Sequence, residues 1–389
     1  MKRLLTFLSL LTLSFTAFSL PGFTPFIQDS PGSYVWYQDF TFQRESYVGF
    51  LTFDQSTYQA RYYAPQNAKS KLPEKDIKIY FSLNPESDHI ELTGERVMAG
   101  TSQEDTEIVN YLHDMIYELN ARRMKAGKLF TPAEKPSEDA SSEEIPARNS
   151  ASEDFLHTGK CIRDNFPQFG GDVNIIYDSL VPLFNIKTIE GPEGKTELGI
   201  LTCGRIQDTQ DSSFDSFTGF PEKFPSKKHG FKLSKKAESL TFTSPDGQTL
   251  SLDSNWKQSM ENLWLLGDAA LISAGLIPKS NVAQKGDFSE EKAITFILRQ
   301  LTFSSSSSYT DWRNLEIQNY DSLLKGSTKA AFKVSANIWQ KESQNLTRSV
   351  KIITEKSGGY AFFTFTVFQN IYQKNQKYFD SILKSYKAE

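Results

Sequence analysis

The sequence has few of the residues and motifs that usually carry catalysis or metal binding. Its 389 residues include only two cysteines and four histidines. No two histidines stand at metal-ligand spacing, and HExxH, CxxC, Gly-x-Ser-x-Gly and glycine-rich phosphate loops do not occur. These absences disfavour the common zinc, serine-hydrolase and nucleotide-binding classes. We therefore expect no catalytic residue, no metal ligand and no cofactor.

Neither sign of charge dominates. Lysine and arginine number 43 against 47 aspartates and glutamates, for a net charge of −4. Such a balance predicts no nucleic-acid partner and no general attraction to an anionic membrane. The hydrophobic fraction of 38% and the charged fraction of 23% suit a globular protein with some disordered length.

A long apolar run occurs only at the N-terminus. Lys2 and Arg3 precede the run Leu4–Ala17, and Ala17 and Ser19 then stand at −3 and −1 of a cut after Ser19. This is typical of a bacterial Sec-type signal peptide over residues 1–19. It predicts a periplasmic or secreted protein of the cell envelope, without a transmembrane span after cleavage. The alternative is an uncleaved anchor, for which the run is short against the roughly 20 residues a bilayer requires.

Aromatic residues are abundant and follow strand periodicity. The chain has 30 Phe and 16 Tyr, and alternation over Tyr34–Phe42, Tyr47–Phe53 and Tyr58–Tyr63 predicts a β-meander. Thr101–Lys125 changes to helical spacing of its apolar residues, and Thr101–Glu104 offers a capping box. We expect an N-terminal meander-plus-helix domain over residues 20–125.

The composition changes after this helix. Residues 126–154 scatter prolines among Ser, Ala, Glu and Asp and hold almost no apolar residue. Such a segment cannot bury enough surface to offset the entropy lost on ordering. It predicts a disordered acidic linker, which would separate the first domain from a C-terminal α+β domain over residues 155–389.

The C-terminal region predicts a second meander. Strands are expected around Phe332–Ile338, Val350–Thr354 and Tyr360–Val367, followed by an amphipathic helix over 369–384. Trp256–Ile277 is apolar and favours one or two helices, stopped by Pro278. The predicted fold class is α+β, with antiparallel meander sheets each closed by an amphipathic helix, in two domains joined by the linker.

The order of elements over Glu238–Glu389 is hairpin, helix, long meander and closing helix. This order resembles small exported α+β modules of the PsbP kind. The resemblance implies a fold and an exported location. It rests on element order, so it brings no functional residue to this chain.

Two sets of residues are candidate sites. Cys161 and Cys203 are a candidate structural disulfide, because an exported chain meets an oxidising compartment; the alternative is two buried thiols. A candidate anion-contact loop surrounds Phe231, and the alternative there is a solvated connection. The loop's lysines are Lys227, Lys228, Lys232, Lys235 and Lys236.

A third, weaker candidate is a calcium site. Asp208, Asp211 and Asp215 could supply oxygen ligands, although their spacing is not that of an EF-hand loop. The alternative is a solvated polar loop.

These observations favour a non-catalytic binding or assembly module whose partner is an envelope protein, lipid or glycan. The alternative is a carboxylate-dependent hydrolase that acts on envelope polymers. A pocket in which two acids face each other would favour the hydrolase. A pocket lined by aromatic and aliphatic side chains would favour binding.

Overall fold

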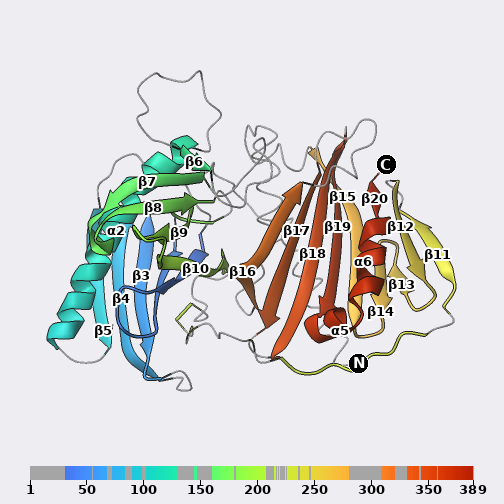
Figure 1. The fold of residues 1–389 in the computed structure, drawn as a ribbon, viewed down its shortest axis with the longest axis horizontal. Coiled ribbons are helices and arrows are strands. Elements are labelled where there is room, and N and C mark those ends of the chain that lie inside the picture. The colour runs from blue at the N-terminus through green and yellow to red at the C-terminus, as the bar shows by residue number, and fades with distance from the viewer. Residues whose placement is uncertain are drawn as a thin grey trace. The chain divides into compact units, whose positions relative to one another are not determined.

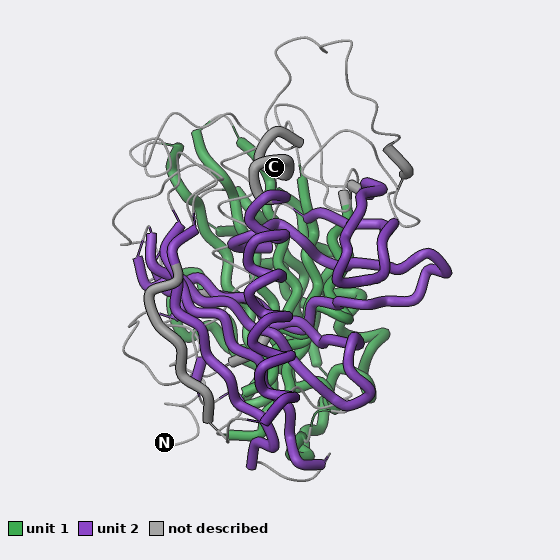
Figure 2. Tube along the Cα trace, turned by 90° about the vertical axis from the view of Figure 1, so that its left-hand side faces the viewer, with its two compact units in different colours: residues 1–21, 221–389 green, residues 22–220 purple. Residues whose placement is uncertain are grey.

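The computed structural model divides the chain after residue 220 into two compact units (Figure 2). Unit 2 contains residues 22–220, and the described residues of unit 1 all lie within 221–389. Antiparallel sheets predominate in both, and helices are few, so the chain is a β-rich α+β protein.

The backbone is described for part of the chain. The described residues are 31–54, 56–67, 72–83, 90–98, 102–129, 144–146, 160–178, 181–206, 214–215, 217, 219, 224, 226–234, 237–244, 247–279, 308–319, 331–340, 343–356 and 358–388. The described side chains exclude residues 92–98, 123–129, 144–146, 160, 205, 308–309 and 319.

Unit 2 is built on a ten-stranded antiparallel sheet with the order β5-β4-β3-β2-β1-β10-β9-β8-β7-β6 (Figure 1). Its strands are β1 (Ser33–Asp39), β2 (Ser46–Thr52), β3 (Thr57–Pro65), β4 (Pro73–Leu83), β5 (Ile90–Met98), β6 (Glu144–Pro146), β7 (Lys160–Phe166), β8 (Gly171–Tyr177), β9 (Ile186–Glu190) and β10 (Thr196–Arg205). A short 3-10 helix, η2 (Pro167–Phe169), follows β7. The predicted meander is the first half of this sheet.

Helix α2 (Gln103–Leu129) confirms the predicted helix and packs against β3 and β4 (Figure 1). All four residues of its predicted apolar face are fully buried, namely Ile108, Leu112, Ile116 and Leu119. The capping box lies one residue later than expected. The Ser102 hydroxyl accepts the Asp105 N–H at 3.2 Å, and the Asp105 carboxylate accepts the Ser102 N–H at 3.0 Å.

The division between the units lies elsewhere than the boundary predicted over residues 126–154. Strand β10 pairs with β1, which places Cys203 opposite Val35. Strands β7 to β9 continue outward from β10, so all four strands belong to the same sheet as the first meander. Most of the predicted linker lies outside the described residues.

Unit 1 contains a seven-stranded antiparallel sheet and a three-stranded sheet, β11-β12-β20. The larger sheet has the order β13-β14-β15-β19-β18-β17-β16. The elements are β11 (Ser239–Thr243), β12 (Gln248–Asp253), β13 (Lys257–Met260), β14 (Leu263–Leu266), β15 (Ala270–Pro278), β16 (Ser308–Asn319), β17 (Ala331–Gln340), β18 (Asn345–Lys356), β19 (Gly359–Phe368), α5 (Gln369–Lys374), α6 (Gln376–Ser385) and β20 (Lys387–Ala388). The three predicted strands of the last meander are confirmed as β17, β18 and β19.

The prediction of helix over Trp256–Ile277 was wrong. This segment forms β13, β14 and β15. Gly267 takes a φ of +54° in the turn between β14 and β15, a backbone conformation that residues other than glycine rarely adopt. The whole of β15 then pairs with β19, so the sheet satisfies its backbone polar groups and overrides the helix-compatible spacing.

One face of the seven-stranded sheet is covered by the C-terminal helices. Phe365 on β19 lies 5.4 Å from Phe379 on α6, measured between ring centroids, and Phe363 lies 4.5 Å from Tyr386. All four rings belong to the buried core of unit 1. Full burial of each contributes about 1.5–3 kcal/mol, so this contact holds α6 on the sheet.

Candidate functional site

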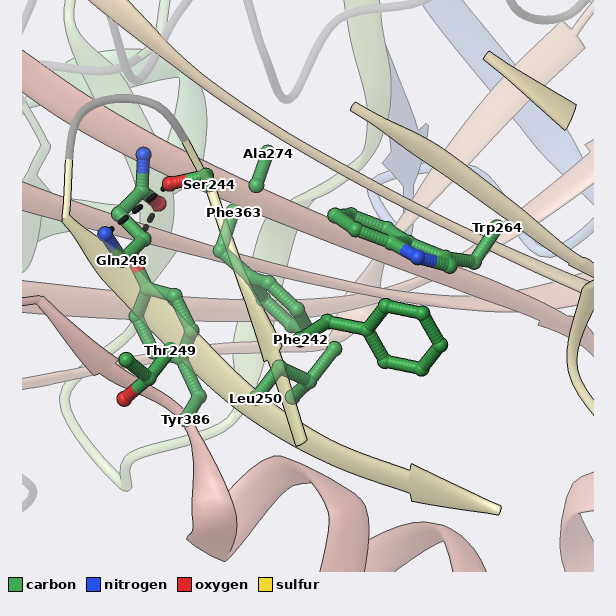
Figure 3. A pocket seen from close by; sticks show the side chains of 9 residues that line it. All are labelled: Phe242, Ser244, Gln248, Thr249, Leu250, Trp264, Ala274, Phe363 and Tyr386. Atoms are coloured by element: carbon green, nitrogen blue, oxygen red, sulfur yellow. Dashed lines mark hydrogen bonds between the residues drawn. The ribbon is translucent and has the colours of Figure 1, made fainter. Parts of the chain in front are cut away.

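A small pocket lies in unit 1 between the β11–β12 hairpin and the seven-stranded sheet (Figure 3). Its free volume is about 10 Å³, so its own lining side chains nearly fill it. The lining residues come from both sheets and from the chain after α6; they are Phe242, Ser244, Gln248, Thr249, Leu250, Trp264, Ala274, Phe363 and Tyr386.

Gln248 organises the polar end of the pocket (Figure 3). Its side-chain oxygen accepts the Tyr386 hydroxyl at 2.6 Å, and its Nε2 donates to the Gly275 carbonyl at 3.0 Å. Its backbone N–H donates to Ser244 Oγ at 3.0 Å. These buried bonds join the hairpin, β15 and the end of α6, so this end of the pocket is a structural anchor.

The apolar end contains an indole whose hydrogen-bonding capacity is unused. Trp264 is 3% exposed, and its Nε1 is buried without a hydrogen-bond partner. The ring of Phe242 packs edge-on against it, with centroids 5.5 Å apart. Phe242 is only partly buried and sits on the outermost strand of its sheet. A ligand that displaces Phe242 would therefore reach an apolar wall with one hydrogen-bond donor.

Strand β11, above the pocket, is an exposed edge strand. Its residues are exposed except for the partly buried Phe242, and Leu240 retains 42% of its surface. Leu240 and Phe242 face the same side as their partners Leu252 and Leu250 on β12. Charged residues and prolines, which commonly protect edge strands, are absent from Ser239–Thr243.

The pocket has groups for contact rather than for proton transfer. None of its nine lining residues is an acid, a histidine, a lysine or a cysteine. Its aromatic and aliphatic walls suit an apolar group, and its few polar groups could orient it. It thus lacks the facing acids that the hydrolase alternative requires.

The lysine-bearing segment is an anchored strap rather than a loose loop. Across residues 226–234, which run along the lower edge of unit 1 in Figure 1, the side chains of Phe231 and Leu233 pack on the core. The His229 ring stacks on Phe368 at 3.6 Å, and its Nε2 lies 2.9 Å from Asn345 Oδ1.

Three of the five candidate anion-contact lysines lie within the described residues. Lys227, Lys228 and Lys232 are all exposed. Lys235 and Lys236 lie outside the described residues. Contact of these lysines with an anion remains a proposal.

No disulfide joins Cys161 and Cys203, and both side chains are buried. Cys161 is on β7 and Cys203 on β10, with β8 and β9 between them in the sheet. Adjacent strands lie about 4.8 Å apart, whereas bridged cysteines need Cα atoms within about 7 Å. The structure therefore supports the alternative of two buried thiols. Burial raises the pKa of the Cys161 thiol.

One of the three candidate calcium ligands, Asp215, is already in an ion pair. The Asp215 carboxylate lies 2.7 Å from Lys78 Nζ and accepts the Gln59 amide at 3.1 Å. Asp208 and Asp211 lie outside the described residues. Across the described ranges, no group of three His, Cys, Asp or Glu side chains is placed to hold a metal ion. Within the same ranges, no helix has the length and apolar character needed to cross a bilayer.

Sequence reasoning missed the pocket because two of its walls were assigned differently. Trp264 and Ala274 were placed on a helix, whereas they stand on neighbouring strands. The hairpin after Glu238 and the amphipathic helix over 369–384 are both predicted from the sequence. What joins them is pairing between β12 and β20, which no local pattern indicates.

Comparisons with known proteins give the following likenesses. No curated protein matches this chain. A similar solved structure is the solution structure of cyanobacterial PsbP (CyanoP) from Synechocystis sp. PCC 6803, with 10% identity and a TM-score of 0.28. The likeness covers 41% of this chain and 98% of that chain. Residues 32–215 match a domain of unknown function, DUF7954, and residues 241–387 match a second domain of unknown function, DUF7955.

Proposed function

We propose that the protein is an exported bacterial envelope protein and a non-catalytic binding module. An extended segment of a partner protein would pair with the open edge of β11 and place an apolar side chain in the pocket below. The observation that carries this proposal is the unprotected edge of β11 directly beside an apolar pocket.

Strand addition fits the chemistry of this edge. An added strand gains main-chain hydrogen bonds, and its alternate side chains face the pocket side. It would cover Leu240 and Phe242, which are more exposed than their β12 partners Leu252 and Leu250, both 5% exposed or less. The buried apolar surface and the edge hydrogen bonds would then act together.

Export is the second part of the proposal. Lys2, Arg3 and the apolar run before Ser19 support it. Intact-mass measurement of the protein from a bacterial envelope fraction tests it directly. We expect the mature chain to begin at Leu20, and a chain that retains residues 1–19 would contradict cleavage.

The binding proposal is tested by site-specific photo-cross-linking. A photoreactive amino acid replaces Thr243, an exposed residue at the end of β11, in the full mature chain. The protein is irradiated in envelope extract and its adducts are identified by mass spectrometry. We expect a protein adduct that contains an apolar, strand-forming segment.

Two lysine variants provide the matched comparison. Leu240→Lys puts a charge on the edge of β11, and Met260→Lys does the same at a 60% exposed residue of the edge strand β13. We expect Leu240→Lys to reduce the adduct about tenfold, which corresponds to ~1.4 kcal/mol, while Met260→Lys leaves it unchanged. Equal yields in both variants, or adducts with lipid or glycan alone, would overturn the proposal.

A further inference from the structure

A polar patch lies on the seven-stranded sheet, on the face opposite the helix-covered core. Lys351 on β18 stands directly opposite Thr364 on β19, which stands opposite Ser273 on β15. In the next row, Ser349 stands opposite Thr366. Directly paired residues and residues two apart on a strand share a face. One lysine and four hydroxyl side chains therefore form a single group, the lysine patch.

The lysine patch is buried and its polar groups are incompletely satisfied. The four hydroxyl residues are each 9% exposed or less. Ser349 is 2% exposed, and its Oγ is buried with no hydrogen-bond partner. A buried polar atom without a partner destabilises the fold. The partner of such an atom can be a water, an ion or another bound molecule.

Among the described residues, Lys351 has no counter-ion. In the part of the chain that the structure describes, no carboxylate forms an ion pair with it, whereas Glu355 on the same strand is paired with Lys279 at 3.0 Å. The surrounding protein lowers the pKa of Lys351 to about 7, and burial is the cause. The residue as a whole has intermediate exposure, while its amine is buried. A buried amine without a counter-ion is stabilised by an anion that reaches it.

The surroundings of the patch are apolar. Val334 on β17 stands opposite Lys351, and Ile353 and Phe362 form the adjacent row on the same face. These three side chains are 7% exposed or less. A ligand here would thus meet one cation and several hydroxyl donors within an apolar frame.

We propose that the lysine patch binds a carboxylate head group attached to an apolar body. Lys351 would pair with the carboxylate, and Ser349 with Thr364 or Thr366 would donate hydrogen bonds to its oxygens. Val334, Ile353 and Phe362 would contact the apolar body. This site lies on the other face of the sheet from the β11 pocket and does not depend on the proposed function.

The test follows Lys351 by NMR in the full mature chain labelled with ¹³C-lysine. The Lys351 signal is assigned by its loss in Lys351→Met. Octanoate is the probe; octanol, which lacks the charge, and acetate, which lacks the apolar body, are the comparisons. We expect octanoate to raise the pKa of Lys351 by about one unit, equivalent to tenfold coupling between ligand and proton, with smaller effects from acetate and none from octanol.

Variants separate the patch from general surface binding. We expect Lys351→Met to weaken octanoate binding at least about tenfold and Ser349→Ala to weaken it by a smaller factor. Lys257→Met removes an exposed lysine from β13 and should leave binding unchanged. Equal binding in Lys351→Met and Lys257→Met, or octanol binding as tightly as octanoate, would overturn the proposal. If Lys351→Met fails to fold, the test is the pKa of Lys351 in the wild-type protein. A pKa that octanoate leaves unchanged would overturn the proposal.

Discussion

Arg61 and Asp76 form a two-pronged ion pair inside unit 2. Arg61 Nε lies 2.7 Å from Asp76 Oδ1, and Nη2 lies 2.8 Å from Oδ2. Nη1 donates to the carbonyls of Phe214 and Phe217 at 2.9 and 3.2 Å. The phenyl rings of these two residues stack on Trp36. One guanidinium thus holds Phe214 and Phe217 against the sheet.

Removing the carboxylate of this pair should strongly destabilise unit 2. The two side chains are 2% and 8% exposed, so Asp76→Ala leaves a buried charge unpaired, at a cost of about 3–5 kcal/mol. Urea unfolding followed by circular dichroism measures this change. Asp172→Ala is the matched control, because its partner Arg163 and Asp172 itself are 66% and 59% exposed, and exposed pairs contribute about 0–1 kcal/mol. If both variants lose the same free energy of unfolding, the buried Arg61–Asp76 pair stabilises the fold no more than the exposed pair does.

Gly49 should be intolerant of a side chain. A Cβ at this residue would lie 2.6 Å from the Trp36 ring, which is itself stacked on Phe217 with centroids 4.0 Å apart. We expect Gly49→Ala to destabilise the fold by about 1–3 kcal/mol, the usual cost of overpacking. Gly230→Ala is the control, since nothing lies within 4 Å of its Cβ. A normal unfolding midpoint for Gly49→Ala would contradict the close contact.

The buried carboxyl of Asp39 should make stability depend on pH. Burial raises the pKa of Asp39, opposed by hydrogen bonds from Thr41, and the charge of Glu197 raises it further. Oδ1 accepts the Thr41 N–H at 2.9 Å, whereas Oδ2 is buried without a partner. The pKa of Asp39 is higher in the folded state than in the unfolded state, so the unfolded state releases this proton at lower pH. The free energy of unfolding therefore falls as pH rises from the unfolded-state pKa through the folded-state pKa.

Asp39→Asn removes this charge and keeps an oxygen for the Thr41 N–H. We expect the variant to be more stable than the wild type at pH 7, with the difference shrinking towards pH 4. Thermal melting over this pH range measures the effect. Tyr62, Tyr111 and Arg44 also face this region, so each is kept unchanged in both proteins. A difference that does not vary with pH would contradict the assignment to Asp39.

The hydroxyl of Tyr386 should stabilise the closure of unit 1. Tyr386→Phe leaves Gln248 Oε1 without its 2.6 Å donor in a buried site, so we expect a loss of about 1–3 kcal/mol. Tyr117→Phe serves as the control because Tyr117 is 48% exposed. Chemical denaturation of both variants measures the difference, and identical midpoints would mean that the bond has no net effect.

Both cysteines should be recovered as thiols. With Cys161 and Cys203 on strands separated by two others, we expect two reactive thiols per chain in Ellman's assay after unfolding without reductant. The native protein should react slowly because both side chains are buried. If the unfolded chain shows no reactive thiol, Cys161 and Cys203 are bridged, as the disulfide prediction states.

Local patterns predicted the elements whose stability is local or whose alternation is regular. Helix α2 and strands β17 to β19 have apolar residues at the period of their own structure. The segment Trp256–Ile277 has similar residues, yet its state is decided by β19, about ninety residues later in the chain. The same reason explains why the ten-stranded sheet was divided into two domains in the prediction.

The candidate pocket could not be predicted for a related reason. Its polar anchor depends on Gln248 and Tyr386, which are 138 positions apart. The lysine patch was equally hidden, because Lys351 looks like an ordinary surface lysine until the register places Thr364 beside it. Residue type indicates which interactions a side chain can form. The pairing of distant strands shows which side chains come into contact.

The pairing of early strands with late ones has a consequence for how the chain is made. In unit 2, the Tyr37 hydroxyl donates to the Ile186 carbonyl across 149 positions, and in unit 1 the Tyr386 bond to Gln248 spans 138. Contacts this distant slow folding, because bringing the two ends of a long chain segment together costs entropy before any contact forms. A nascent chain would therefore hold β1 unpaired with β10 until most of unit 2 had been synthesised. During that time the apolar strands are open to other partners, so chaperone dependence would be greatest before each unit closes.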